Sequence, residues 1–548
     1  QMSIYSSRPW LQAIDPLVPR EIDLPEIPVY KFLSDSFKKF PSNIAICYYG
    51  TEITYAEFEY LTNKLANGLK SIGVKKGDRV AIHMDNCPQY AIGFFALMKL
   101  GAVVVQIGPM ASAKEILTMI NDSGAKGIIT LDFLVGKIQE IFDESSLEFI
   151  VAGSLHDYLP INPFPCAPFG VPDPQPIPNQ ENIFEFNKLL NQSGQFNCAD
   201  INPREDLAVL QYTSGTTGMP KGVMITHFNI TSYVTCAKIL DYKNVEGEEV
   251  YPVNLPLSHN YAMFQTLVLP IALGGKVVIM VRFHPDEILK TIHHHRCTCC
   301  RAVPTILAML AQHPKLEEFD LTSVRHWIVG GAPVPEKIVN VFKKISGGNV
   351  AEGYGLTETT SGVIINRLYG QTLAGMGMPF IETDIRIINP GTGEDVPIGE
   401  AGELLIKGPT VSAGYWEKPE ETSKTFESGW LHSGDLVRLT QEGVLQFVDR
   451  LKELIIVAGF NVYPSEVENT IYQHPSIMEA AVIGMSDERQ GEVVKAMVRL
   501  KPGFELKEDE LIAFCQEKLS PYKVPKIVQF VEDFPRTAVG KILKRALR

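Results

Sequence analysis

The stretch Tyr212-Thr213-Ser214-Gly215-Thr216-Thr217-Gly218-Met219-Pro220-Lys221-Gly222 separates two short apolar segments. Residues 206–212 before it and 222–227 after it have the composition of strands. Between them, glycine and hydroxyl residues allow backbone N–H groups to approach an anion, and Lys221 adds a charge suited to phosphate. A solvated turn is the alternative, because Gly/Ser/Thr clusters usually form turns. The density of such residues here favours a loop that binds a polyphosphate.

Two common nucleotide motifs do not fit this loop. A P-loop requires glycine directly before the lysine and a helix after it, whereas Pro220 precedes Lys221 and a strand follows. The Rossmann fingerprint Gly-x-Gly-x-x-Gly at a strand-to-helix turn is not formed by Gly215 and Gly218. The stretch instead closely resembles the phosphate loop of the acyl-adenylate-forming superfamily, which includes acyl-CoA synthetases, firefly luciferase and the adenylation domains of peptide synthetases. Further segments resemble this family over nearly the whole chain, in family order and spacing.

Length and composition are those of a multidomain globular protein. At 548 residues the chain exceeds what one hydrophobic core normally holds, so two or more domains are expected. A net charge of −13 argues against general binding to nucleic acid or anionic membranes. No apolar run of about 18 residues predicts a transmembrane helix. The nine cysteines are odd in number and mostly isolated, which favours free thiols and a cytoplasmic location.

One group of cysteines raises the question of a metal site. Cys297, Cys299 and Cys300 lie next to His293-His294-His295. Their spacing differs from the Cys-x-x-Cys of structural zinc sites. We favour the alternative, a helix over residues 286–294 that continues into a buried strand over 297–303.

The pattern along the chain predicts an α/β fold. Helical spacing over residues 55–72 and 89–99 alternates with apolar strands over 79–84 and 101–105, which is typical of a sheet covered on both faces. Prolines over residues 163–178 preclude regular structure and predict an extended excursion. Beyond residue 370, short strands with Gly/Pro turns predict a small β-barrel-like region, and the last hundred residues alternate helices and strands again.

We therefore expect two domains. The large N-terminal domain, residues 1–449, would bind ATP and the acid, with α/β subdomains over about 1–200 and 201–370 and a barrel-like region over 371–448. Residues 450–548 would form a small, mobile α+β lid domain. The charged quartet Asp449-Arg450-Leu451-Lys452 marks the expected boundary, although a plain surface turn is the alternative for it.

The resemblance implies that the enzyme joins a carboxylate to the α-phosphate of ATP and releases pyrophosphate. In that case the loop residues Thr213, Ser214, Gly215, Thr216, Thr217 and Gly218, with Lys221, would hold phosphates. The segment Tyr354-Gly355-Leu356-Thr357-Glu358 matches the family pattern Tyr-Gly-x-Thr-Glu. Glu358 would bind Mg²⁺ through hard oxygen donors, Thr357 would bind the α-phosphate, and Tyr354 with Gly355 would contact adenine. Taken alone, Thr-Glu-Thr is more often a helix cap.

Two further segments complete the expected nucleotide site. Gly331, Ala332 and Pro333 follow an apolar strand over residues 326–329, and a glycine-rich strand end allows a flat base to approach. Asp435, in the family's ribose motif, would accept hydrogen bonds from the ribose hydroxyls, and Arg450 would add a contact. Without the resemblance, an Asp after Ser-Gly is usually a turn residue.

The C-terminal segment Pro535-Arg536-Thr537-Ala538-Val539-Gly540-Lys541 resembles the family's second catalytic motif. Composition alone would favour a solvated basic tail, given Lys544 nearby. The resemblance implies that Lys541 bridges the carboxylate and the α-phosphate during adenylation. It also implies that the small domain rotates about a hinge at Lys452 between the half-reactions, after which Gly459 would leave room for the pantetheine arm of coenzyme A.

The acid itself is less well defined. The segment Ser258-His259-Asn260-Tyr261 matches the border of the family's acid pocket, with His259 as the gate, although many relatives carry Phe where this chain has Ser258. Residues 260–269 contain no acidic residue that could neutralise an amino group, and apolar neighbours favour a medium- or long-chain fatty acid. An aryl acid such as a hydroxycinnamate, a luciferase-like reaction and a non-catalytic nucleotide-binding relative remain alternatives. ATP, Mg²⁺ and coenzyme A are the expected small molecules, and a monomer or homodimer is the expected assembly.

Overall fold

The computed structural model describes residues 3–213, 220–487, 489–536 and 542–547. The chain divides into two compact units. The larger unit comprises Trp10–Asp384 and Ile406–Leu431, and the smaller comprises Gln1–Pro9, Ile385–Leu405 and His432–Arg548. The predicted fold class is confirmed: the structure is a mixed α/β protein with a large N-terminal domain and a separate small C-terminal domain. Among the described helices, none is both long and apolar enough to span a bilayer.

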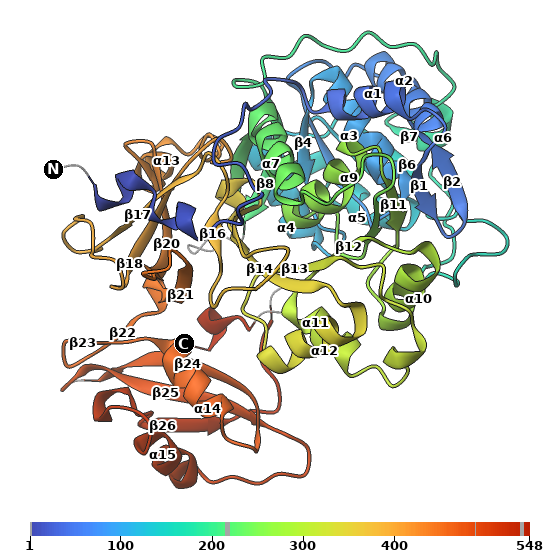
Figure 1. Ribbon diagram of the computed structural model, residues 1–548. Helices are drawn as coiled ribbons and strands as arrows, with labels where there is room; N and C mark the ends of the chain where they lie inside the picture. Colours follow the sequence, from blue (N-terminus) through green and yellow to red (C-terminus); the bar gives the residue numbers. More distant parts are fainter. Residues whose placement is uncertain (1–2, 214–219, 488, 537–541, 548) are drawn as a thin grey trace. The chain divides into compact units, whose positions relative to one another are not determined.

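A seven-stranded sheet forms one layer of the larger unit (Figure 1). Its strands are parallel apart from the last pair, β8 and β9, which is antiparallel. The order across the sheet is β7 (Ile183–Glu185), β6 (Phe149–Gly153), β5 (Gly127–Leu131), β3 (Arg79–His83), β4 (Val103–Gln106), β8 (Leu207–Thr213) and β9 (Lys221–Thr226). The strands predicted on both sides of the phosphate loop are therefore confirmed.

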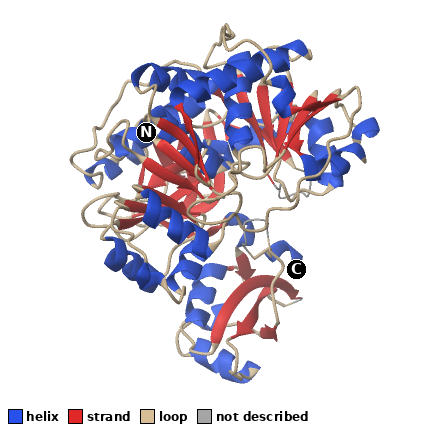
Figure 2. Cartoon of the chain, turned by 90° about the vertical axis from the view of Figure 1, so that its right-hand side faces the viewer, coloured by secondary structure: helices blue, strands red, loops and turns tan. Residues whose placement is uncertain are grey.

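Helices cover both faces of this sheet (Figure 2). Val80 and Ile82 of β3 pack into a core with α2 (Tyr55–Ser71) and α3 (Pro88–Leu100). Ala81 between them packs on the opposite face, with α4 (Ala113–Ser123) and α5 (Val135–Gln139). Because alternate residues of each strand enter two different cores, the strands are apolar throughout, as the sequence predicted.

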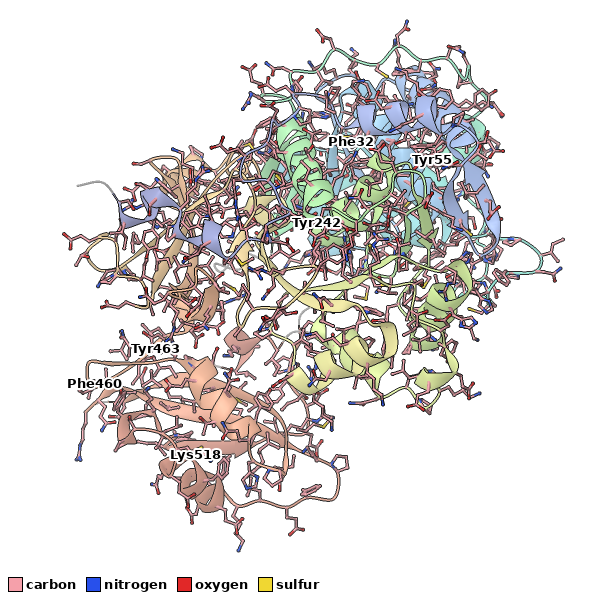
Figure 3. The ribbon with its side chains drawn as sticks, in the orientation of Figure 1. Phe32, Tyr55, Tyr242, Phe460, Tyr463 and Lys518 are labelled. Atoms are coloured by element: carbon pink, nitrogen blue, oxygen red, sulfur yellow. The ribbon has the colours of Figure 1, made fainter. Side chains whose placement is uncertain are left out.

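Side-chain caps fix where several of these helices begin. Thr54, Ser112 and Thr226 precede α2, α4 and α7 (His227–Leu240), and each accepts a hydrogen bond from the backbone N–H three residues on. A side chain at that third position returns the bond, which completes a capping box. Tyr55, in the first turn of α2, is fully buried and donates a 2.6 Å hydrogen bond to the carbonyl of Gly275 (Figure 3).

A second sheet joins distant parts of the chain. Ile46 pairs in parallel with Val277, so two strands that are more than 200 residues apart in sequence lie side by side. The order is β10 (Val250–Val253), β11 (Lys276–Ile279), β1 (Ile44–Tyr48) and β2 (Thr51–Thr54). Strands from both sides of residue 200 thus share sheets. Shorter helices nearby are α1 (Tyr30–Lys39), α6 (Phe186–Leu189), α8 (Asn260–Ala262), a π-helix (Met263–Val268) and α9 (Leu269–Ala272).

The third sheet of the larger unit carries several predicted site residues at its strand ends. Its order is β12 (Cys299–Ala302), β13 (His326–Gly330), β14 (Asn349–Gly355), β15 (Gly362–Ile365) and β16 (Met378–Pro379). Helices α10 (Pro285–His295), α11 (Pro304–Ala311) and α12 (Glu336–Ser346) cover one face. Between β6 and β7 the proline-rich segment contains neither helix nor strand, as predicted.

The region beyond residue 370 forms short strands, as expected. They are β17 (Asp384–Ile388), β18 (Gly402–Lys407), β20 (Trp430–Leu439), β19 (Phe426–Glu427) and β21 (Leu445–Arg450), with α13 (Pro419–Thr425) before β19. In the order of this sheet, β17 and β19 are the ends, and β21 pairs with β20. Strands β18 and β20 carry the chain from one compact unit to the other.

The C-terminal domain has its own core. Its strands are β22 (Ile455–Val457), β23 (Phe460–Val462), β24 (Ile477–Asp487), β25 (Gly491–Leu500) and β26 (Ile527–Phe530). Val467 of α14 (Pro464–Tyr472) and Leu511 of α15 (Glu508–Gln516) are fully buried against the same face of this sheet. An independent core is what a domain that moves as a body requires.

Candidate active site

The phosphate loop is anchored by the pairing of Thr213 with Lys221 across β8 and β9. The predicted residues Ser214, Gly215, Thr216, Thr217 and Gly218 lie outside the described residues. At the exit of the loop, the ammonium group of Lys221 forms an ion pair with Glu421 and lies 5.2 Å from the centre of the Tyr415 ring. The Lys221 side chain is only 18% exposed, so its charge is held in place rather than free in solvent.

Tyr415 connects Lys221 to Glu358. The Tyr415 hydroxyl donates a 2.7 Å hydrogen bond to Oε1 of Glu358. Burial, and then the charge of Glu358, raises the pKa of the Tyr415 hydroxyl, so it remains a donor at neutral pH. The structure therefore brings together the predicted phosphate-binding lysine and the predicted metal ligand, which are far apart in sequence.

The backbone beside Glu358 has an unusual conformation. Thr357–Thr359 form one turn of 3₁₀ helix, and the next residue, Thr360, has φ 70° and ψ −52°. The N–H of Ser361 bonds to the carbonyl of Thr359 at 2.8 Å across it, which makes Thr360 the centre of a γ-turn. Its hydroxyl donates to the carbonyl of Thr410 at 2.7 Å. Such strained residues cluster at functional sites, where surrounding contacts hold them.

Gly355 has a packing reason to be glycine. A β-carbon there would lie 2.1 Å from the carbonyl oxygen of Ser361, because β14 and β15 approach closely at their ends. Tyr354, the residue before it, is half-buried and pairs with Ile364 of β15. The Tyr-Gly pair of the motif therefore fixes the start of the loop that presents Thr357 and Glu358.

Gly331, Ala332 and Pro333 directly follow β13 and are exposed, with Gly331 at φ 96°. They lie beside β14, whose Glu352 accepts a 2.9 Å hydrogen bond from the N–H of Val334. Burial raises the pKa of the Glu352 carboxyl group. Polar and exposed residues thus occupy the carboxyl ends of both parallel strands, where ligands bind in open α/β sheets.

The predicted acid gate is held by side-chain amides. Asn86 exchanges hydrogen bonds with the backbone of Leu255 and Leu257, and Gln106 and Gln211 donate to the next carbonyls of the segment at 3.2 Å. These amides lie at or near the carboxyl ends of β3, β4 and β8.

His259 and Asn260, which follow this anchored segment, differ in exposure. The His259 ring is exposed, and its Nδ1 accepts a 3.3 Å hydrogen bond from the N–H of Tyr261. Asn260 is 2% exposed, and neither polar atom of its amide has a hydrogen-bond partner among the described residues. The gate therefore presents a histidine to solvent and a buried, unsatisfied amide behind it.

Asp435 and Arg450 face each other within the smaller unit. They are paired across β20 and β21, with Arg450 Nε 3.7 Å from Asp435 Oδ1. Asp435 is 5% exposed and its N–H is held by the Ser433 hydroxyl at 3.1 Å. The predicted ribose pair is thus placed together.

Lys452 lies in a single 3₁₀ turn, Leu451–Glu453, between β21 and β22. Gly459, with φ 84°, and Ala458, with φ 49°, form the two-residue turn of the β22–β23 hairpin, which is the left-handed pairing of a type I′ turn. A β-carbon on Gly459 would meet no described atom within 4 Å. Phe460 beside it (Figure 3) is 58% exposed. Its ring stacks on that of Tyr522.

Lys541 lies outside the described residues, but the segment around it is anchored. Arg536 donates to both carboxylate oxygens of Glu479 at 2.8 Å. Lys544 forms ion pairs with Glu468 at 2.7 Å and with Glu453, next to Lys452, at 3.2 Å. Burial opposes the charge of Lys544, yet these two carboxylates raise its pKa. The alternative that composition alone favoured, a solvated basic tail, does not describe Lys544, because the fold surrounds it with acids that lie far away in sequence.

Sequence reasoning missed two residues of the site. These residues are Tyr415 and Glu421, to which the sequence assigns no role. An aromatic and an acid can be assigned to Lys221 only when the long-range contact is known. Tyr415 lies beside the loop only through a tertiary contact, in which its neighbour Trp416 donates a backbone hydrogen bond to Gly222.

The cysteine cluster separates in the fold. Cys299 lies beside Asp241 and His326, at 3.6 and 3.4 Å, and Arg325 contacts both Asp241 and Glu249. Burial works against the charge of His326, but Cys299 and then Asp241 raise its pKa to about 9. Since the acids, His326 and Arg325 balance one another, this is a buried ionic network.

A Gly/Ser/Thr-rich loop between paired strands, a Tyr-Gly-x-Thr-Glu strand end and a separate small domain define the class of adenylate-forming enzymes. The chain belongs to the AMP-binding enzyme family, whose model matches residues 33–416, with the C-terminal domain of AMP-binding enzymes matching 466–541. The predicted superfamily and the predicted enzyme class, an ATP-dependent acid–thiol ligase that forms AMP, are confirmed.

Relatives and solved structures agree over almost the full length. The long-chain-fatty-acid–CoA ligase of Bacillus subtilis is 38% identical over 99% of this chain and 98% of its own. The feruloyl-CoA synthase of an Amycolatopsis species is 35% identical over 93% of this chain and 96% of its own. ATP-bound MatB from Rhodopseudomonas palustris superposes with a TM-score of 0.83 at 28% identity, covering 95% of this chain and 98% of MatB. The anthranilate CoA ligase AuaEII in complex with anthranoyl-AMP superposes with a TM-score of 0.82 at 26% identity, covering 96% of this chain and 98% of AuaEII.

Proposed function

We propose that this chain activates a carboxylic acid, most simply a medium- or long-chain fatty acid, and transfers its acyl group to coenzyme A. In the first step a carboxylate oxygen attacks the α-phosphorus of ATP and pyrophosphate leaves. In the second step the sulfur of coenzyme A attacks the acyl carbon and AMP leaves. The observation that carries the proposal is the approach of Lys221 to Glu358 through Tyr415.

Lys221 and the loop residues from Thr213 onward would hold the β- and γ-phosphates. The ion pair between Lys221 and Glu421 supports this role, because it shows that an anion is accommodated at the lysine. Thr357 would donate to the α-phosphate. Glu358 offers hard carboxylate oxygens that fit Mg²⁺, and this ion would offset the negative charge of the phosphates.

Adenine would lie against Gly331, Ala332 and Pro333 on one side and Tyr354 with Gly355 on the other. The exposed ends of β13 and β14 support this assignment, since they leave backbone and aromatic surface for a flat base. Asp435 would accept hydrogen bonds from the ribose hydroxyls, with Arg450 as a further contact. The 5% exposure of Asp435 supports a role beyond that of a solvated turn residue.

The domain of residues 450–548 would act as a lid that turns about Lys452. Lys541 would neutralise charge where the carboxylate meets the α-phosphate, and Gly459 would leave room for the pantetheine arm in the second step. The ion pairs of Lys544 support this division, because they tie the segment after Lys541 to the turn that contains Lys452.

The acid is the least constrained part of the proposal. A fatty acid is supported by the name of the Bacillus subtilis relative and by the apolar residues Met263 and Phe264, which follow the gate and are fully buried. An aryl acid is the second candidate, supported by the feruloyl-CoA and anthranilate relatives. We further propose a cytoplasmic monomer or homodimer, and the nine free cysteines support that compartment.

The test is ATP–pyrophosphate exchange with a panel of fatty and aryl acids, with and without coenzyme A. Exchange with at least one acid, followed by its CoA thioester when coenzyme A is present, is the expected result. No exchange with any acid would contradict the enzyme assignment. Exchange without a thioester would instead indicate an amide-forming or luciferase-like reaction.

A further inference from the structure

Arg301 is a buried cation that forms no ion pair with a carboxylate of the described residues. It lies on β12, is 2% exposed, and points to the face of the sheet opposite α10–α12, since its neighbours Cys300 and Ala302 pack with those helices. Its Nε donates a 2.6 Å hydrogen bond to Oε1 of Gln265. Its Nη1 has no hydrogen-bond partner, and no carboxylate among the described residues forms an ion pair with it.

Arg325, which directly precedes β13 of the same sheet, provides the comparison. It contacts the carboxylates of Asp241 at 3.1 Å and Glu249 at 2.9 Å, both almost fully buried. Among the described residues the fold therefore supplies two carboxylates to Arg325 and none to Arg301, which has the amide of Gln265 and the ring of Tyr251, 5.2 Å away. An arginine cannot become neutral in a protein, and a buried charge without a partner is costly.

The gate segment holds another buried polar group without a partner, since neither polar atom of the Asn260 amide has one among the described residues. The hydroxyl of Tyr233 lies near Arg301 and interacts with Ser361 and Gln265. A β-carbon on Gly362, next to Ser361, would lie 3.8 Å from Nε2 of Gln265. The ring of Tyr233 lies 6.5 Å from that of Phe264, next to Gln265. Buried polar groups are normally satisfied, so this group of atoms has the character of a binding site.

This group lies directly behind the predicted acid gate. Tyr261, two residues after His259, donates hydrogen bonds to the carbonyls of Ile328 at 2.8 Å and Ala302 at 3.2 Å, and Ala302 follows Arg301. Gln265 lies on the π-helix that begins four residues after His259. An acid that passes the gate would therefore extend toward the guanidinium group.

We propose that Arg301, positioned by Gln265, binds an oxygen acceptor carried by the acyl group, so that the enzyme selects acids with a second oxygen-bearing group over plain ones. The guanidinium group donates hydrogen bonds in a fixed planar arrangement that fits a carboxylate, and it can also donate to a hydroxyl or keto oxygen. This inference rests on the proposed function and narrows its acid.

The experiment compares kcat/KM for acids matched in length: decanoate, 10-hydroxydecanoate and decanedioate, with cinnamate and 4-hydroxycinnamate as the aryl pair. We expect the unmodified enzyme to prefer the oxygenated member by at least about tenfold, since a donor left unpaired by the plain acid carries a penalty. Arg301→Met should remove that preference and leave the plain acid unchanged or improved. The carboxylate, hydroxyl and aryl arms show which acceptor is bound.

Two variants keep the proposal testable if Arg301→Met is unstable. Gln265→Leu removes the positioning bond and should weaken the same preference while KM for ATP stays unchanged. Arg301→Lys keeps the charge without the planar donors and should restore part of the preference for decanedioate. The inference would be overturned if the unmodified enzyme preferred plain acids, or if the variants lost kcat/KM equally for both members of each pair. In either of these outcomes ATP–pyrophosphate exchange still occurs with at least one acid. If the proposed function itself is wrong, no acid supports exchange.

Discussion

Tyr415 Oη donates a 2.7 Å hydrogen bond to Glu358 Oε1 while its ring lies 5.2 Å from Lys221 Nζ. One side chain therefore contacts both the proposed metal ligand and the proposed phosphate ligand. Two such groups must keep a fixed separation if they act on the same triphosphate, and a rigid ring between them provides it. Tyr415 is accordingly a positioning residue.

Removing only the hydroxyl tests this role. In Tyr415→Phe the ring remains under Lys221, but the Glu358 carboxylate loses a hydrogen bond of about 1 kcal/mol. We expect the Mg²⁺ concentration for half-maximal exchange to rise about fivefold, with a small change in thermal stability. Titrating Mg²⁺ at saturating ATP measures this. Tyr472→Phe, which loses a hydroxyl bond to the Ala480 backbone, is the matched control. An unaltered Mg²⁺ dependence would show that the Tyr415 hydroxyl does not position Glu358.

Much of the fold could be predicted from local patterns. The helical spacing over residues 55–72 and 89–99 matches α2, Tyr55–Ser71, and α3, Pro88–Leu100, to within one residue at either end, because periodicity and caps are encoded within a few residues. The pairing of Ile46 with Val277 could not be predicted in this way. Parallel pairing across such a separation is decided by tertiary packing, which no local pattern reports.

The residues of the candidate site could likewise be predicted only in part. Motifs placed Lys221, Glu358 and Asp435, since each belongs to a short segment with a recognisable spacing. Glu421 and Arg301 carry no such local signal: a charged residue in a helix or a strand is normally on the surface. Only the fold shows that one neutralises Lys221 and that the other is buried.

The ion pair between Glu421 and Lys221 predicts competition with ATP. If Lys221 binds phosphate as proposed, the phosphate must replace this carboxylate, so Glu421→Gln should lower KM for ATP by roughly threefold, as expected for a partly exposed pair. The kcat should change little, and the effect should diminish at high salt. Steady-state kinetics at two ionic strengths would measure it, with Glu420→Gln as the neighbouring control. A higher KM for ATP in Glu421→Gln would show that the acid assists binding.

The ionic network around His326 predicts a pH-dependent stability. The pKa of His326 is raised to about 9, so its stabilising charge is fully present below the unfolded-state value of about 6.5. That contribution is lost as pH rises toward and through 9. We expect His326→Gln to lower Tm by roughly 3–6 °C near pH 6 and by much less near pH 9.5.

Calorimetry of both proteins across this range measures the difference, and His294→Gln, at an exposed position, is the control. A constant gap between the unmodified protein and His326→Gln would mean that His326 is neutral in the fold. At the acidic end the sign reverses, because the pKa of Asp241 is lowered by His326, Tyr369 and Arg325 against the opposing effect of burial. Stability contributed by Asp241 is present above about pH 4 and is lost as pH falls further.

The two half-reactions can be separated at Lys541. If Lys541 offsets charge only where the carboxylate meets the α-phosphate, Lys541→Ala should lower ATP–pyrophosphate exchange by about 10²–10³. Thioester formation from supplied acyl-adenylate should fall less than about threefold, because no phosphate bond forms in that step. Lys518→Ala, an exposed lysine of the same domain (Figure 3), is the control. Equal loss of both half-reactions in Lys541→Ala would refute a role confined to adenylation, and would indicate instead that the lysine holds the C-terminal domain in its fold.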